Sequence, residues 1–116
     1  LRFVGPFGDE REDNERSLVF VLEFKDHTAL FTGDADMRGE RRWVYSDVDI
    51  LKVGHHGSRT STSEELLERF KPEVALIGVG NNSFGHPTKE VLDKLNRYGV
   101  EIHRTDIEGA IRIELP

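Results

Sequence analysis

Histidine and aspartate side chains follow three apolar runs of this sequence, and these residue types can bind metal ions or move protons. The run Val48–Val53 stops at Gly54 and is followed by His55 and His56, with Gly57 directly after them. An imidazole at the end of a buried strand is well placed to bind a metal. The sheet fixes its backbone, and the flanking glycines leave room for a ligand.

Two further phrases repeat this design. Asp34 follows Gly33 at the end of the apolar run 28–32, and His86 comes after the apolar run 74–79. In α/β sheets functional residues collect at strand ends, so three successive strand ends can build one site along one edge. We therefore predict a single metal-binding site with four candidate ligands, of which the chain supplies two or three: Asp34, His55, His56 and His86.

The two residue types offer different roles. The carboxylate of Asp34 can bridge two divalent ions, whereas either His55 or His56 can bind a metal while the other moves a proton. Two neighbouring metal ions can activate a water molecule and neutralise a phosphate or carboxylate oxygen in hydrolysis. Asp34 and His56 are thus the candidate catalytic residues, and an ordinary turn or capping role is the alternative for each candidate.

Composition limits the kind of protein. A chain of 116 residues is one domain or part of one, and its net charge of −6 argues against binding nucleic acid without help. Divalent metal ions can supply the local positive charge that a phosphate needs, so a nuclease is not excluded. The absence of cysteine excludes disulfides and zinc–thiolate sites, and no apolar run approaches membrane-spanning length.

Apolar periodicity and turn residues predict an α/β domain with helices flanking a mixed sheet. Residues 1–13 are expected to be a loop, a capping box at Ser61 or Thr62 is expected to start the second helix, and 106–109 is expected to be a turn. The predicted strands are 17–24, 28–32, 48–53, 74–79, 100–104 and 110–115, and the predicted helices are 36–45, 62–70 and 88–98.

Five phrases in order carry a family resemblance: N-x-x-S-L-V at 14–19, LFTGDAD at 30–36, DVDILKVGHHGS at 47–58, NNSFGHP at 81–87 and RTDIEGAI at 104–111. This succession closely resembles the C-terminal half of metallo-β-lactamase-fold hydrolases, and within them the ComEC-like DNA-uptake (competence) proteins and their stand-alone relatives. The resemblance implies an αββα sandwich, of which residues 1–116 are one partial domain. It also implies two divalent ions, zinc or manganese, and hydrolysis of phosphodiesters, thioesters or lactams.

The resemblance also implies roles for individual residues. Asp34 matches the carboxylate that bridges the two metals. His55 matches the histidine that binds metal after the next strand, and His56 then supports it or transfers a proton, although the roles of these two histidines are interchangeable. His86 matches a later histidine that binds metal or substrate in nuclease-like members.

The family's principal metal motif, H-x-H-x-D-H, does not occur in this sequence, which also opens at Leu1 rather than Met. We therefore expect a partial domain whose partner is the missing N-terminal half. Alone, it should bind divalent metal weakly or not at all, lack hydrolase activity, and self-associate through its uncovered sheet face.

Three functions remain open for the complete protein. The first is a metal-dependent hydrolase of nucleic acid in DNA uptake, with this chain in a soluble domain of a bacterial inner-membrane protein and without membrane contact of its own. The second is a stand-alone hydrolase of small molecules. The third is a non-catalytic domain with a degenerate metal site. Whether the chain itself is an enzyme is left undecided by its residues.

Overall fold

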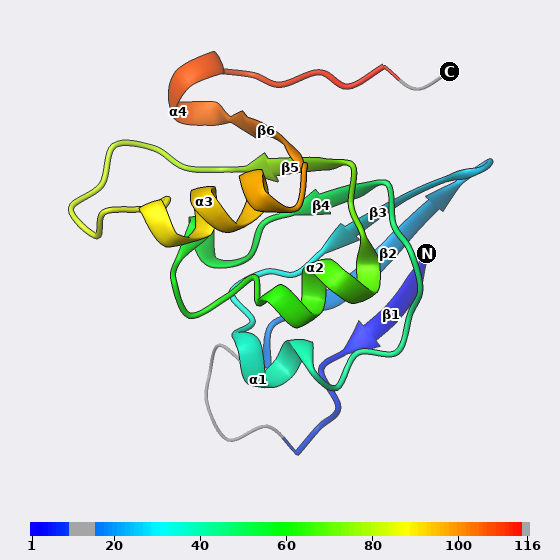
Figure 1. The fold of residues 1–116 in the computed structure, drawn as a ribbon. Coiled ribbons are helices and arrows are strands. Elements are labelled where there is room, and N and C mark those ends of the chain that lie inside the picture. Colours follow the sequence, from blue (N-terminus) through cyan, green and yellow to red (C-terminus); the bar gives the residue numbers. More distant parts are fainter. Residues whose placement is uncertain (10–15, 115–116) are drawn as a thin grey trace.

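A six-stranded mixed sheet with helices against one face forms the centre of the computed structural model, which describes residues 1–9 and 16–114 (Figure 1). The strands lie side by side in sequence order. The first three pair antiparallel and the third to sixth pair parallel. The strands are β1 (Arg2–Gly5), β2 (Val19–Phe24), β3 (His27–Phe31), β4 (Ile50–Lys52), β5 (Val74–Ile77) and β6 (Glu101–Arg104).

Helices fill the connections between the parallel strands, because parallel neighbours cannot be joined by a tight turn. The helices α1, α2 and α3 lie on the same face of the sheet in Figure 1, which confirms the predicted α/β class. The helical elements are α1 (Met37–Glu40), a 3₁₀ turn η2 (Gly54–Gly57), α2 (Glu64–Phe70), α3 (Lys89–Arg97) and α4 (Thr105–Glu108).

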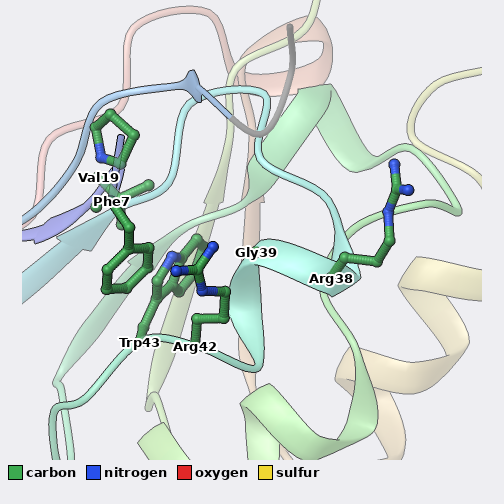
Figure 2. A pocket seen from close by; sticks show the side chains of 8 residues that line it. Phe7, Val19, Arg38, Gly39, Arg42 and Trp43 are labelled. Carbon is green, nitrogen blue, oxygen red and sulfur yellow. The ribbon is translucent and has the colours of Figure 1, made fainter. Parts of the chain in front are cut away.

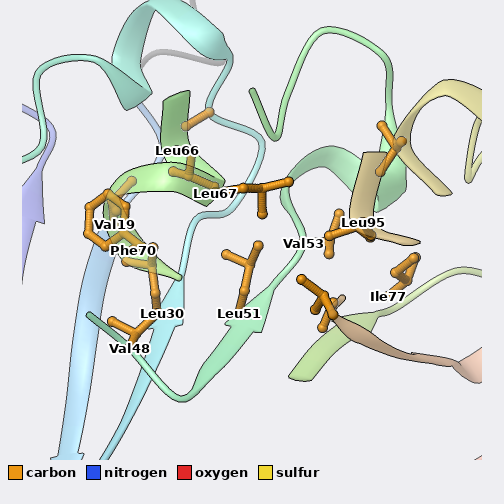
Figure 3. Packing of buried hydrophobic residues seen from close by; sticks show 14 of the residues in the cluster. Val19, Leu30, Val48, Leu51, Val53, Leu66, Leu67, Phe70, Ile77 and Leu95 are labelled. Atoms are coloured by element: carbon orange, nitrogen blue, oxygen red, sulfur yellow. The ribbon is translucent and has the colours of Figure 1, made fainter. Parts of the chain in front are cut away.

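The hydrophobic core lies between the sheet and α1–α3 (Figure 3). Successive strand residues point to opposite faces, so Val19 and Val21 of β2 are buried while Phe20 and Leu22 point away from the helices. Apolar residues spaced three to four apart put one stripe of α2 against the strands. This stripe consists of Leu66, Leu67 and Phe70, each at most 2% exposed.

The opposite face of β1–β3 carries aromatic and aliphatic side chains, and we call it the open face. Phe20 stacks on Phe31 with ring centroids 4.9 Å apart, and Phe3 meets Phe20 edge-on at 6.4 Å. Farther along β2, Leu22 is 46% and Phe24 63% exposed. A single sheet with helices on one side supplies one sheet–helix layer of the expected αββα sandwich, and the open face is where its second sheet would pack.

The N-terminal prediction was wrong in part. Residues 2–5 were expected to be loop, but they form β1, which pairs with β2 through Phe3 opposite Phe20 and Gly5 opposite Val19. Four residues are too short a run to show a clear period beside the charged stretch that follows. Residues 10–13 of the predicted loop, and Asn14 of the first family phrase, lie outside the described residues.

The C-terminal prediction was also wrong. Residues 105–108, most of which were read as a turn, form α4. The described part of the predicted strand 110–115, residues 110–114, is not a strand, although it alternates in polarity. A strand needs a neighbour to satisfy its backbone, and β6 pairs with β5 alone among the described strands.

The length of α1 and the capping residue of α2 also differ from the prediction. The helix predicted at 36–45 is confined to Met37–Glu40, where Asp36 caps it by accepting from Arg38 N and Gly39 N. The capping box at Ser61 or Thr62 is absent, because the cap of α2 is Ser63, whose hydroxyl oxygen accepts from Leu66 N at 3.0 Å.

Candidate metal-binding edge of the sheet

The carboxyl ends of β3, β4 and β5 meet at one edge, because these three strands run parallel. The turn after β3 and the turn after β4 are joined by their main chains, with His55 N donating to Gly33 O at 2.9 Å. Asp34 N donates to Ser17 Oγ at 3.0 Å, which fixes the backbone of the exposed Asp34. The structure thus places Asp34 and His55 at one edge, as predicted.

Gly54 permits this close approach of the two turns. A Cβ atom at Gly54 would lie 3.0 Å from Thr32 Oγ1 and 3.4 Å from Ala35 O. Ser61, which was predicted to be an ordinary cap, instead donates its hydroxyl to Gly54 O at 2.8 Å and stabilises the turn. That support was not visible in the sequence, since seven residues separate the two groups.

His55 and His56 both have left-handed backbone conformations, with φ of 47° and 55°. Such backbone geometry is unfavourable for residues with a Cβ and concentrates at functional sites. His55 Nδ1 is buried and has no hydrogen-bond partner among the described residues. A buried nitrogen without a partner costs free energy unless something absent from the protein chain binds it.

His56 is held differently, by its ring. Its Nδ1 lies 2.5 Å from the carbonyl oxygen of Gly78, just after β5. A carbonyl oxygen only accepts, so Nδ1 carries a proton, and in the neutral form of the ring Nε2 keeps its lone pair. An imidazole fixed through one nitrogen to a carbonyl is the arrangement that orients metal-binding histidines. Both adjacent histidines therefore have a nitrogen able to bind, and their roles remain interchangeable.

His86 joins the site through a tight contact between two loops. A Cβ atom at Gly57 would lie 2.5 Å from Pro87 Cβ, and Thr88 N donates to Gly57 O at 3.0 Å. The rings of His55 and His86 consequently meet edge to face, with centroids 5.6 Å apart. Burial, then the charges of His55 and His56, lower the pKa of His86 below its ordinary value of 6.5, which favours the neutral form.

Asn82 organises the loop that carries His86 and was missed in the sequence. Its side-chain oxygen accepts from Phe84 N at 3.0 Å and His86 N at 3.1 Å, while its Nδ2 donates to His86 O at 2.9 Å. Asparagine before such a turn was the available signal. Phe84 is 79% exposed and stacks on His86 at 5.8 Å.

Two charged residues near the edge were also missed. Lys52, at the end of β4, is half-buried. Burial lowers its pKa, while the negative charge of Asp34 opposes that shift. Glu40 is 2% exposed and accepts from Thr62 N at 2.5 Å and Ser63 N at 2.9 Å, and burial raises the pKa of this carboxyl. Glu40 thus joins α1 to the start of α2.

Hollows of different character flank these elements. A polar groove of about 540 Å³ is lined by His86, Asn82, Thr105 and Asp106 among others. The segment that follows β6 therefore lies close to His86. A smaller pocket of about 110 Å³ lies elsewhere, between β1 and α1, where the Arg42 guanidinium stacks 4.2 Å from the Phe7 ring centroid (Figure 2). None of the four predicted ligands lines that second pocket.

The residue types at this edge include donors that metal ions accept. The unpartnered His55 Nδ1 and the oriented His56 ring have the right donor chemistry. Within residues 1–9 and 16–114, however, no three His, Asp or Glu side chains converge closely enough to hold an ion. A catalytic zinc ordinarily has about three protein ligands and a water. The described chain alone therefore lacks a complete donor set.

Comparison with known proteins defines the class. The sequence profile of the metallo-beta-lactamase superfamily matches residues 3–80, which include Asp34, His55 and His56. The chain belongs to the metallo-β-lactamase superfamily.

Its relatives include much longer proteins, one of which is named as a competence protein. It is 38% identical over 106 residues to Recombination protein 2 of Haemophilus influenzae, covering 89% of this chain and 14% of that protein. It is 38% identical over 109 residues to ComE operon protein 3 of Bacillus subtilis (90% and 14%), and 37% identical over 112 residues to Competence protein ComA of Neisseria gonorrhoeae (90% and 16%). The chain thus spans only 14–16% of the length of these relatives.

No helix in the described segments is long and apolar enough to cross a membrane.

Proposed function

We propose that this chain is the C-terminal part of a metal-dependent hydrolase domain that cleaves nucleic-acid phosphodiesters during DNA uptake. The relative named as a competence protein supports the biological setting. The observation that carries the chemistry is the buried His55 Nδ1, which has no hydrogen-bond partner among the described residues and lies beside the oriented His56 ring. The backbone N of the same His55 donates to Gly33 O, which ties it to the turn that carries Asp34. On this proposal the complete protein is a bacterial inner-membrane protein whose soluble domain includes this chain.

In the complete domain, Asp34 would bridge two ions, zinc or manganese, and His55 or His56 and His86 would complete the ligands from this side. Bound metal would activate water and neutralise a phosphate oxygen. The histidine that does not bind metal would move a proton, and because Gly78 O fixes Nδ1 of His56, its Nε2 is the atom available for that transfer. The remaining ligands would come from an N-terminal half that carries H-x-H-x-D-H.

That N-terminal half is also the partner proposed for the open face. Three side chains on that face are each 46% to 63% exposed: Phe3, Leu22 and Phe24. Together they form an apolar patch, whereas most exposed apolar residues of a protein surface are isolated. In the separate 116-residue chain, a second copy would cover the same face, which makes a dimer the simplest assembly.

The test is cleavage of single-stranded DNA by the full-length gene product, with Mn²⁺, with Zn²⁺ and with a chelator. We expect metal-dependent cleavage that Asp34→Asn and His55→Ala lower at least about a hundredfold. Metal-dependent hydrolysis of a thioester or lactam without cleavage of DNA would favour the small-molecule alternative. Absence of metal binding by the full-length protein would favour the non-catalytic alternative with a degenerate site. The lack of three converging ligands in the described residues is the observation behind that alternative.

A further inference from the structure

Lys52 is a cation at the candidate edge whose hydrogen-bonding capacity the described chain leaves largely unused. An ammonium group has three donors. The bond found for Lys52 Nζ is a long one, 3.4 Å to the carbonyl oxygen of Val53. No described carboxylate lies within 4.0 Å of Nζ, although the charge of Asp34 acts on it from farther away. The side chain is nevertheless half-buried.

Partial burial of an unpaired ammonium group costs free energy, so a lysine without a function would tend to extend into water. Two other lysines of the chain make polar contacts with nearby groups. Lys89 pairs with Asp93 at 2.5 Å, and Lys94 donates to Thr62 O at 2.9 Å. Lys94 is also half-buried and has no ion pair in the described residues, but it makes a bond of ordinary length, whereas the bond of Lys52 is long.

Gly78 gives a second, independent indication. A Cβ atom at Gly78 would lie 3.2 Å from Lys52 Cε and 3.3 Å from Lys52 Nζ, closer than such contacts ordinarily are. Gly78 is not among the residues with positive φ, so its backbone conformation does not demand glycine. The missing side chain instead leaves space for the end of Lys52. The carbonyl oxygen of the same Gly78 fixes His56, so the ammonium group and the imidazole share one neighbour.

We propose that the ammonium group of Lys52 is a phosphate-binding subsite, which donates to a non-bridging oxygen of a phosphodiester lying at the strand-end edge beside His56. The inference rests on the proposed function for taking a nucleic acid as the ligand, and it adds the residue that holds the phosphate. A chain of net charge −6 does not attract a polyanion through its overall charge. A single cation held in position can still bind one phosphate. Unspent donors match the non-bridging oxygens of a phosphodiester.

Binding of a short single-stranded DNA to the full-length gene product, in the presence of chelator and over a range of salt concentrations, tests the subsite. Lys52→Met should raise the dissociation constant about tenfold or more. It should also reduce the slope of log affinity against log salt by about 0.7, the value for one phosphate contact on a single strand. Inorganic phosphate should compete with the strand in the wild type and lose that effect in Lys52→Met.

Lys25→Met is the matched control, since it removes the same charge from the β2–β3 hairpin at the other end of β3. It should change neither the affinity nor the slope. Gly78→Ala keeps the charge of Lys52 and displaces the ammonium group, so it should weaken binding several-fold. Lys52→Met that binds like Lys25→Met overturns the proposal. Should Lys52→Met not fold, unchanged binding by Gly78→Ala overturns it equally.

The outcomes separate this subsite from the proposed hydrolase activity. Lys52-dependent binding by a protein that cleaves no phosphodiester under any metal keeps the subsite and removes the hydrolase. Metal-dependent cleavage with the same KM in the wild type and in Lys52→Met keeps the hydrolase and removes the subsite.

Discussion

Gly57→Ala tests whether the contact between two glycine-bearing loops builds the candidate site. Gly57 has φ of +85°, where a Cβ atom costs about 1 kcal/mol or more. The added Cβ would also lie 2.5 Å from Pro87 Cβ and 2.9 Å from Pro87 Cα, and the second of these is main chain that cannot rotate away. Overpacking of this kind costs about 1–3 kcal/mol. We expect the free energy of unfolding to fall by roughly 2–4 kcal/mol.

Urea unfolding of the 116-residue chain, followed by the fluorescence of its single tryptophan, measures this loss. Trp43 is 2% exposed, so unfolding changes its surroundings strongly. Gly99→Ala is the control, because φ is +70° there but nothing lies within 4 Å of the added atom. It should lose only the backbone part, about 1 kcal/mol. Equal losses in the two variants would refute the argument that the Gly57–Pro87 contact positions His86.

Three further predictions concern other parts of the chain. Because burial raises the pKa of Glu40, the folded chain holds that proton more tightly than the unfolded one. Stability should therefore decline as pH rises from about 4.5 through the raised pKa, and pH-dependent urea unfolding of Glu40→Gln should lack this decline. Calorimetry of the 116-residue chain should give dissociation constants for Zn²⁺ weaker than about 1 µM, with His55→Ala weaker still; tight stoichiometric binding would mean that the ligand set is already complete. Sedimentation of the same chain should show a dimer that Leu22→Lys and Phe24→Lys convert to monomer, and a wild type that stays monomeric at high concentration would remove the role given to the open face.

The local sequence was sufficient to predict the elements that have both a periodic apolar pattern and residues typical of a turn or cap at their ends. The stripe of α2 and the strand before His55 could be recognised because apolar spacing reports burial on one face. The segment 110–114 has the same alternation and yet forms no strand. Alternation describes what a strand would bury, whereas pairing depends on a neighbour that the local sequence does not specify.

The site divides in the same way. The placement of Asp34, His55 and His86 at one edge could be predicted because the ends of parallel strands meet there, and the structure brings the rings of His55 and His86 together. Glu40 and Lys52 were not predictable. Their importance lies in burial and in contacts with residues more than 20 positions away, such as Glu40 with Thr62 and Lys52 with Gly78. Nothing in their local sequence distinguishes them from solvated charges.

The hydrogen bonds at the edge have a consequence for the order in which the histidine turn forms during synthesis. His55 N donates to Gly33 O, the His56 ring donates to Gly78 O, and Thr88 N donates to Gly57 O, so each bond closes a loop of about 20 to 30 residues. The histidine turn cannot reach its final geometry until residue 88 has left the ribosome and α3 has started. The final geometry of this turn is therefore acquired late, after most of the sheet has formed, and a nascent chain stalled before that residue would present both histidines unanchored to solvent.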